Sequence, residues 1–285
     1  MLYNTILLRY GEIFLKGKNR NIFERKLIEN IKKITGIKKI ENLRSRFVVD
    51  YFTNHKSLKL VFGLVSYSPA LRVDRDIEKI KEKVLEILKM KKGTFKIETK
   101  RSDKTFPIKS PDMNTLVGIF VEENSNFKFS FEKPDHIIKI EINQEGAYLF
   151  LEIERCFGGL PVGVGGNVLL LVEDEISLLA GLLFMKRGCN VFPVCLGSEK
   201  DISLLQKFSP TKLELKAVKD FFEIEKYAKD KKIKVLVSRQ NFNNLNNYKT
   251  ELIVMKPLIA YDDKKIKKEL KEFMLVSYDI NHNYG

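Results

Sequence analysis

The stretch GGLPVGVGGNVLLLVEDEISLLAGLLFMKRG, from Gly158 to Gly188, decides the fold of the C-terminal part of the chain. A glycine-rich segment leads into the apolar run Val168–Val172, and a second apolar segment follows after a turn. This pattern predicts a strand–turn–helix unit, the place where an α/β sheet commonly binds a phosphate. The turn, however, carries the three acidic residues Glu173–Glu175 where a bound anion would sit.

Apolar runs alternate with amphipathic segments from residue 167 onward, which predicts a parallel, doubly wound sheet. The expected strands are Val168–Val172, Val191–Leu196, Leu213–Val218, Val235–Ser238 and Leu252–Met255. The expected helices are Ile176–Arg187, Asp201–Phe208, Phe221–Lys229 and Asp263–Phe273.

The first part of the chain reads as two small α+β domains. The first has a strand at Thr5–Tyr10, a helix that Asn21 and Glu24 would open with a capping box, and a strand at Phe47–Phe52. The stretch Phe62–Pro69 contains Gly, Ser and Pro, and we place a hinge and domain boundary there.

The second α+β domain is predicted from two helices and three strands. The expected elements are a helix opened by Asp76, a strand at Phe95–Arg101, a helix with Ser110 as N-cap and Pro111 at its first position, and a hairpin of Ile137–Ile142 with Ala147–Ile153.

Composition limits the class of protein. Of the 285 residues, 44% are hydrophobic, which is enough for buried cores. The longest uncharged apolar run, Ile176–Met185, is about half of the roughly 20 residues that span a bilayer, and no signal peptide is expected. Three cysteines without a CxxC spacing favour a reducing cytoplasm, and three scattered histidines predict no metal cluster.

The net charge of +14 is concentrated at the N-terminus. Residues 1–60 carry 14 Lys and Arg against 5 Asp and Glu, whereas residues 61–155 carry 17 against 16. A local excess of positive charge favours a nucleic-acid partner, although a solvated basic surface would look the same in sequence.

Two basic segments are the candidates for an RNA contact. The first surrounds Gly17, and the second is KRSDKTFP at residues 100–107, which follows the expected strand Phe95–Arg101. Basic residues interleaved with an aromatic residue suit a phosphate backbone with an exposed base, although a solvated loop is the alternative. The candidate residues are Lys16, Lys18, Arg20, Lys100, Arg101, Lys104 and Phe106.

Five stretches in order resemble the tRNA 4-thiouridine synthetases, also called tRNA sulfurtransferases or ThiI. They are RYGEIFLKGKNRNIFERKLIENI, FKIETKRSDKTFPIKSPDMNTLVG, GGLPVGVGG, MKRG and KPLIAYDDKKI. The resemblance implies an N-terminal ferredoxin-like domain at 1–60, a THUMP domain at 61–157 and a Rossmann-like PP-loop domain at 158–285. It also implies a homodimer in which the first two domains hold the acceptor end of tRNA.

In that family the PP-loop domain uses ATP to adenylate a tRNA uridine, and a cysteine persulfide then replaces the activated oxygen. Some members also supply sulfur for the thiazole of thiamine. The family's loop has the pattern SGGxDS, in which glycines let backbone N–H groups approach the phosphates. Here the corresponding residues are Val172, Glu173, Asp174, Glu175, Ile176 and Ser177, with no glycine among them.

The departure from the family pattern leads to our prediction. The loop is degenerate, so the chain is expected to bind tRNA in the cytoplasm without ATP-dependent adenylation and with no cofactor. The α/β domain is expected to be a scaffold, or a platform for a separate sulfur-transfer or catalytic subunit. The alternative is an active sulfurtransferase that uses ATP and Mg²⁺ in an atypical site. Of the cysteines, Cys189 and Cys195 are expected to be buried, and Cys156 is expected to be the most accessible.

Overall fold

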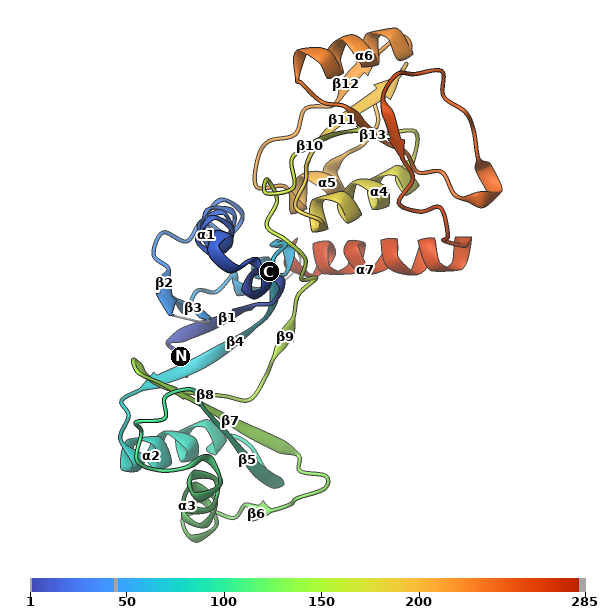
Figure 1. Cartoon of the computed structure of the whole chain (residues 1–285). Helices are drawn as coiled ribbons and strands as arrows, with labels where there is room; N and C mark the ends of the chain where they lie inside the picture. Colours follow the sequence, from blue (N-terminus) through green and yellow to red (C-terminus); the bar gives the residue numbers. More distant parts are fainter. Residues whose placement is uncertain (1, 44–45, 282–285) are drawn as a thin grey trace. The chain divides into compact units, whose positions relative to one another are not determined.

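The computed structural model describes residues 2–43 and 46–281, without the side chains of residues 14–16 and 281. The chain divides into two compact units (Figure 1). The first comprises Met1–Leu8, Glu41–Phe52 and Tyr67–Glu154, and the second comprises Arg9–Ile40, Thr53–Ser66 and Arg155–Gly285. Segments of the expected ferredoxin-like domain thus contribute to both units.

The first unit is built on a mixed sheet with the strand order β2-β3-β1-β4-β8-β7-β5-β6, and β9 pairs with β4. Strands β5 and β7 run parallel, whereas β7 and β8 form the antiparallel hairpin that the sequence predicts. The strands are β1 (Thr5–Tyr10), β2 (Glu41–Leu43), β3 (Arg46–Asp50), β4 (Leu64–Val73), β5 (Thr94–Arg101), β6 (Lys128–Phe129), β7 (His136–Asn143), β8 (Gly146–Phe150) and β9 (Glu154–Arg155).

Helices α2 (Ile77–Leu88) and α3 (Ser110–Glu123) pack on the β5–β7–β8 part of this sheet (Figure 1). Their apolar faces meet alternate residues of the strands in one core, which includes Val84, Val117 and Ile140. Asp76 caps α2 as predicted, because its carboxylate accepts a hydrogen bond from the backbone N–H of Lys79.

Three local predictions for the N-terminal half are wrong. The stretch Phe62–Pro69 is no irregular hinge, because β4 runs from Leu64 through Pro69 to Val73, although the division between the two units does fall within it, between Ser66 and Tyr67. Helix α1 (Arg20–Thr35) follows directly on the 3₁₀ helix η1 (Glu12–Asn19), so Asn21 lies inside the helix, and Glu24 is buried and bound by Tyr10 and Arg20. The N-cap of α3 is Lys109, one residue before the predicted Ser110.

The second unit contains the predicted parallel sheet, with the order β12-β11-β10-β13-β14. Relative to the chain, this order is 3-2-1-4-5, which is the Rossmann arrangement and confirms the fold class. The strands are β10 (Asn167–Leu171), β11 (Asn190–Leu196), β12 (Lys216–Val218), β13 (Val235–Val237) and β14 (Ile253–Met255).

Helices cover both faces of this sheet. Helices α4 (Glu175–Lys186), α5 (Ser203–Phe208) and α7 (Asp263–Asn281) pack in one core with Val168, Leu170 and Val172. Helix α6 (Phe221–Asp230) packs on the other face, against Leu169 and Leu171. This alternation of neighbouring strand residues between two cores is what a doubly wound sheet requires.

Segments from before β4 complete the second unit. The 3₁₀ helix η2 (His55–Leu60) and the following residue Phe62 join the core of α4, α5 and α7. The side chain of Asn30 in α1 donates a hydrogen bond of 3.0 Å to the carbonyl of Val162 in the glycine-rich segment. A short 3₁₀ helix, η3 (Phe242–Asn244), lies between β13 and β14. Across the described residues, we find no helix long and apolar enough to cross a membrane.

Candidate functional site

The strand order of the second unit reverses between β10 and β13, and ligands of open α/β sheets bind where such a reversal meets the carboxyl ends of the strands. In this chain the turn Glu173–Asp174 follows β10 at that place, and Arg239 follows shortly after β13. The acidic turn therefore occupies the position where a nucleotide would be expected.

The turn is closed by its own hydrogen bonds. The backbone N–H groups of Glu173 and Asp174 donate to the hydroxyl of Ser177 at 3.0 and 3.2 Å. In return, the N–H of Ser177 donates to the Asp174 carboxylate at 3.3 Å, which completes a capping box at the start of α4. The N–H groups of Glu173, Asp174 and Ser177 thus have partners within the chain.

The side chains of Glu173 and Asp174 have partners as well. The Arg239 guanidinium lies 3.4 Å from the carboxylate of Glu173 and 3.2 Å from that of Asp174. The hydroxyl of Tyr248 donates to both oxygens of Glu173 at 3.3 Å. The residues between β10 and α4 are therefore tied to the segment that follows β13.

These residues do not fit the triphosphate of ATP. Each carboxylate about 4–5 Å from a phosphate would repel it by roughly 3–4 kcal/mol at an effective dielectric constant near 20. Arg239 offsets one of the three negative charges at Glu173, Asp174 and Glu175 and leaves two. The helix start that attracts anions in other Rossmann-like domains is here stabilised by carboxylates of the chain itself.

The basic segment after β5 contains residues of two kinds. Lys100 and Lys104 are exposed, so their ammonium groups are available to an RNA backbone. The Arg101 guanidinium donates hydrogen bonds of 2.5 and 3.1 Å to the carbonyls of Phe106 and Ile108, so it holds the loop. The Phe106 side chain is 4% exposed and belongs to the α2–α3 core, so its ring is not offered for stacking on a base.

The first basic segment is divided in the same way. Lys18 is exposed, whereas Arg20 donates to Glu24 at 2.6 Å and to the hydroxyl of Tyr10 at 3.1 Å. The environment of Tyr10, mainly its burial and then the hydrogen bond to Glu24, raises the pKa of its phenol to about 12. The side chain of Lys16 lies outside the described part of the structure.

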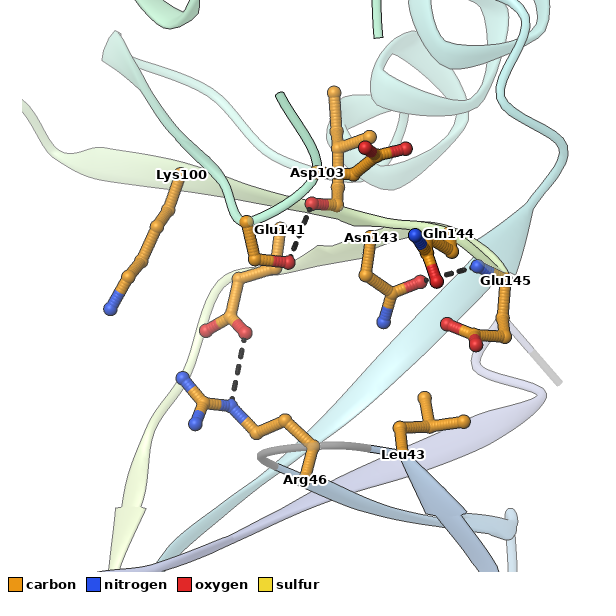
Figure 2. A pocket seen from close by; sticks show the side chains of 10 residues that line it. Leu43, Arg46, Lys100, Asp103, Glu141, Asn143, Gln144 and Glu145 are labelled. Carbon is orange, nitrogen blue, oxygen red and sulfur yellow. Dashed lines mark hydrogen bonds and ion pairs between the residues drawn. The ribbon is translucent and has the colours of Figure 1, made fainter. Parts of the chain in front are cut away.

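A polar pocket of about 420 Å³ lies beside Lys100 in the first unit (Figure 2). Figure 2 shows the Arg46 guanidinium and the Glu141 carboxylate facing each other from β3 and β7, 3.3 Å apart. Asp103, also on the wall, is held by Thr105 and by Arg75 at 2.6 Å. The hydrogen bonds from Thr105, more than the charge of Arg75, keep the pKa of Asp103 below its ordinary value.

The described residues contain no cluster of three or more His, Cys, Asp or Glu side chains that could hold a metal ion. Cys156 is half-buried, whereas Cys189 and Cys195 are buried, as the sequence predicts. Burial raises the pKa of both the Cys189 and the Cys195 thiols, which disfavours the thiolate that sulfur transfer requires.

Sequence reasoning did not identify Arg239 and Tyr248 as partners of the acidic turn. Both lie more than sixty residues after Glu173 in a segment without a recognisable motif, and only the pairing of β10 with β13 brings Arg239 to the turn. An arginine directly after a strand that borders the strand reversal was the available signal.

Comparisons with known proteins agree with this architecture. The family model described as the ThiI ferredoxin-like domain matches residues 5–68, and the model described as the THUMP domain matches residues 74–152. A probable tRNA sulfurtransferase of Mycoplasmopsis synoviae is 38% identical over 191 residues, which are 67% of this chain and 51% of the relative. A protein of the same name from Brevibacillus brevis is 39% identical over 204 residues, with the same coverage. The chain thus spans about half the length of the curated relatives that it matches.

Two crystal structures match almost the whole chain. A Pyrococcus horikoshii protein is similar with a TM-score of 0.84 and 29% identity, over 95% of this chain and 99% of that protein. A 4-thiouridine synthetase, solved as an RNA complex with bound ATP, is similar with a TM-score of 0.82 and 26% identity, over 98% of this chain and 86% of that one. These similarities include the second unit, since they exceed the combined range of the two family models.

Proposed function

The chain belongs to the tRNA sulfurtransferase (ThiI) family through its ferredoxin-like and THUMP domains, and from this we propose that it binds the acceptor end of tRNA without ATP-dependent adenylation activity of its own. The proposed lack of adenylation activity rests on the closed acidic turn after β10.

Three observations support RNA binding. The net charge is +14, with its excess in the first 60 residues. Among the residues predicted to contact RNA, Lys18, Lys100 and Lys104 have exposed side chains. The similar 4-thiouridine synthetase was itself solved with RNA. A surface that places lysines against phosphates binds with a strong dependence on salt.

The proposed tRNA binding is tested with the variant Lys100→Ala/Lys104→Ala, whose affinity for tRNA is measured in a filter-binding titration at several salt concentrations. Arg101 is left intact because it holds the loop through the carbonyls of Phe106 and Ile108. The affinity should fall, and the slope of log K against log salt should decrease by roughly 0.7–0.9 for each phosphate that is no longer neutralised. The control is Lys128→Ala/Lys133→Ala, which removes the same charge, with Lys128 opposite Thr94 at the other end of β5. If the two variants had the same tRNA affinity and the same salt dependence, the assignment of an RNA contact to Lys100 and Lys104 would be wrong.

The proposed lack of ATP-dependent activity is tested by calorimetric titration of the wild-type chain with ATP and Mg²⁺, with and without tRNA. We expect no binding heat in either case, because the N–H groups of Glu173 and Asp174 are already bonded to Ser177 and two uncompensated carboxylate charges remain at the turn. Micromolar binding of ATP would overturn this part and favour an active sulfurtransferase with an atypical site.

The proposal extends to the setting in which the protein works. We place it in the cytoplasm as a homodimer that supplies the RNA-binding part of a tRNA modification reaction, with sulfur transfer or catalysis on a separate subunit. Light scattering on the purified chain tests the dimer: a monomer mass at micromolar concentration would exclude it.

A further inference from the structure

A groove of about 1070 Å³ lies in the second unit, outside the acidic turn. Its walls come from the C-terminal half of α4, the start of α7, the segment after β14 and the glycine-rich segment near Phe157 and Gly159. Two of the stretches that resemble the family, MKRG at 185–188 and KPLIAYDDKKI at 256–266, therefore meet at this groove. The RNA contacts proposed above use neither of them.

Five cations line the groove: Lys186, Arg187, Lys256, Lys265 and Lys268. Within the described residues, none of these five forms an ion pair, although Glu12, Glu269 and Glu272 also line the walls. Elsewhere in the same unit, on α1, Lys26 and Lys33 are both paired with Glu29. In α7, Glu269 follows Lys265 by four residues, and Glu272 follows Lys268 by four residues. Ion pairs within a helix are stronger when the Glu precedes the Lys, so this order is the less favourable one.

The groove combines this charge with apolar surface. Phe184, Met255 and Tyr261 line it, and the Met255 side chain is 44% exposed at the open edge of the sheet. The ammonium group of Lys265 lies 3.7 Å from the centre of the Tyr261 ring, so a cation and an aromatic ring are presented together. Grooves that bind single-stranded nucleic acid combine these two features, since cations follow the backbone and aromatic rings stack on bases.

We propose that this groove binds a single-stranded segment of RNA, with the cations of α4 and α7 on its phosphates. The inference deepens the proposed RNA binding by adding a second contact surface, on the α/β unit. RNA is favoured over an acidic protein segment because cations without ion pairs beside a half-buried aromatic ring suit a repeating phosphate with a base against the ring.

The wild-type chain provides the most direct test. Its lysines are acetylated with an N-hydroxysuccinimide ester in the absence and presence of saturating single-stranded oligouridine or tRNA transcript, and the products are quantified by mass spectrometry. Labelling of Lys256, Lys265 and Lys268 should fall at least threefold with either RNA. Labelling of the exposed residues Lys219, Lys229 and Lys234, which lie in or next to α6 on the opposite face of the sheet, should not change.

Matched variants give an independent measurement. Lys256→Ala/Lys265→Ala/Lys268→Ala should bind oligouridine at least fivefold more weakly and should lower the salt slope by roughly 0.7 for each phosphate that is no longer neutralised. Lys219→Ala/Lys229→Ala/Lys234→Ala removes the same charge and should bind like the wild type.

The outcomes separate this inference from the proposed function. If the groove lysines are labelled equally with and without RNA, while Lys100→Ala/Lys104→Ala still weakens tRNA binding, the groove assignment is wrong and the proposed function stands. If the groove lysines are protected by oligouridine, but tRNA binding does not depend on Lys100 and Lys104, the groove assignment stands alone. Equal loss of affinity in the groove and control variants would show a general charge effect and would overturn the inference.

Discussion

The Arg239 guanidinium lies 3.2 Å from the Asp174 carboxylate, and this ion pair joins the ends of the two strands between which the sheet order reverses. In a Rossmann-like sheet, a ligand usually fills that position. Here side chains of the chain fill it, because Ser177, Arg239 and Tyr248 satisfy the backbone and the carboxylates of the turn. The Rossmann fold is thus present with a closed acidic turn at the position where a ligand usually binds.

Substitution of Ser177 by Ala should destabilise the second unit. The Ser177 hydroxyl accepts two backbone N–H groups and is fully buried, so its loss leaves both donors without a partner. The expected cost is about 1–2 kcal/mol, or a fall in melting temperature of roughly 3–6 °C. Thermal unfolding followed by circular dichroism measures it. The exposed residue Ser198 provides the control, because Ser198→Ala should leave the melting temperature unchanged.

The architecture of the second unit could be predicted from the sequence because its signals are local. The run Val168–Val172, the apolar helix after it and the later alternation of strands and helices reflect periodicity and short connections. Every predicted strand is found, with ends that differ by a few residues, the largest difference being at β12, which begins at Lys216 rather than at Leu213.

The side-chain partners could not be predicted, because they depend on contacts between distant residues. Phe106 looks like an exposed aromatic residue between lysines, yet it closes the α2–α3 core, and its ring lies 5.6 Å from the Arg75 guanidinium. Arg20 looks like a free cation, but Glu24 and Tyr10 bind it. A sequence shows which residues are charged, whereas only the folded chain shows which charges are already paired.

Gly159 should not tolerate a side chain. Its φ of +79° lies in the left-handed region, and a Cβ there would lie 2.2 Å from the carbonyl oxygen of Lys186, to which Leu160 also donates. Gly159→Ala should therefore cost about 2–4 kcal/mol, since the strain of φ adds to a backbone collision. Urea unfolding measures the difference in free energy.

The neighbouring residue provides a matched control for that collision. Gly158 has a φ of +68°, and the nearest atom to a Cβ there is a methyl carbon of Val65 at an ordinary 3.9 Å. Gly158→Ala should lose only about 1 kcal/mol, from the backbone strain. If both variants were equally destabilised, the contact with Lys186 would contribute nothing and the prediction for Gly159 would be wrong.

Tyr10→Phe should lower the free energy of unfolding by an amount that depends on pH. The Tyr10 hydroxyl donates to buried Glu24 at 2.6 Å, so its loss should cost about 1–2 kcal/mol at pH 8. The pKa of Tyr10 is raised from 10.0 to about 12 in the folded chain, so its contribution is complete below pH 10 and declines as the pH approaches 12. The difference in unfolding free energy between wild type and variant should therefore shrink above pH 10. A constant difference between pH 8 and pH 11 would contradict the raised pKa.

The three thiols should differ in reactivity. Cys189 and Cys195 are buried and their pKa values are raised by burial, so little thiolate forms near neutral pH and reagents have little access to either sulfur. Cys156 is half-buried, and its sulfur lies 3.8 Å from the carbonyl of Leu58. In the native chain at pH 8, a chromogenic disulfide reagent should modify Cys156 at least tenfold faster than the other two, and all three thiols should react at once in guanidinium chloride. Cys156→Ser should abolish the fast phase. A fast phase that persists in this variant would mean that Cys189 or Cys195 becomes exposed in the native protein, and either would then have to be reconsidered as a sulfur carrier.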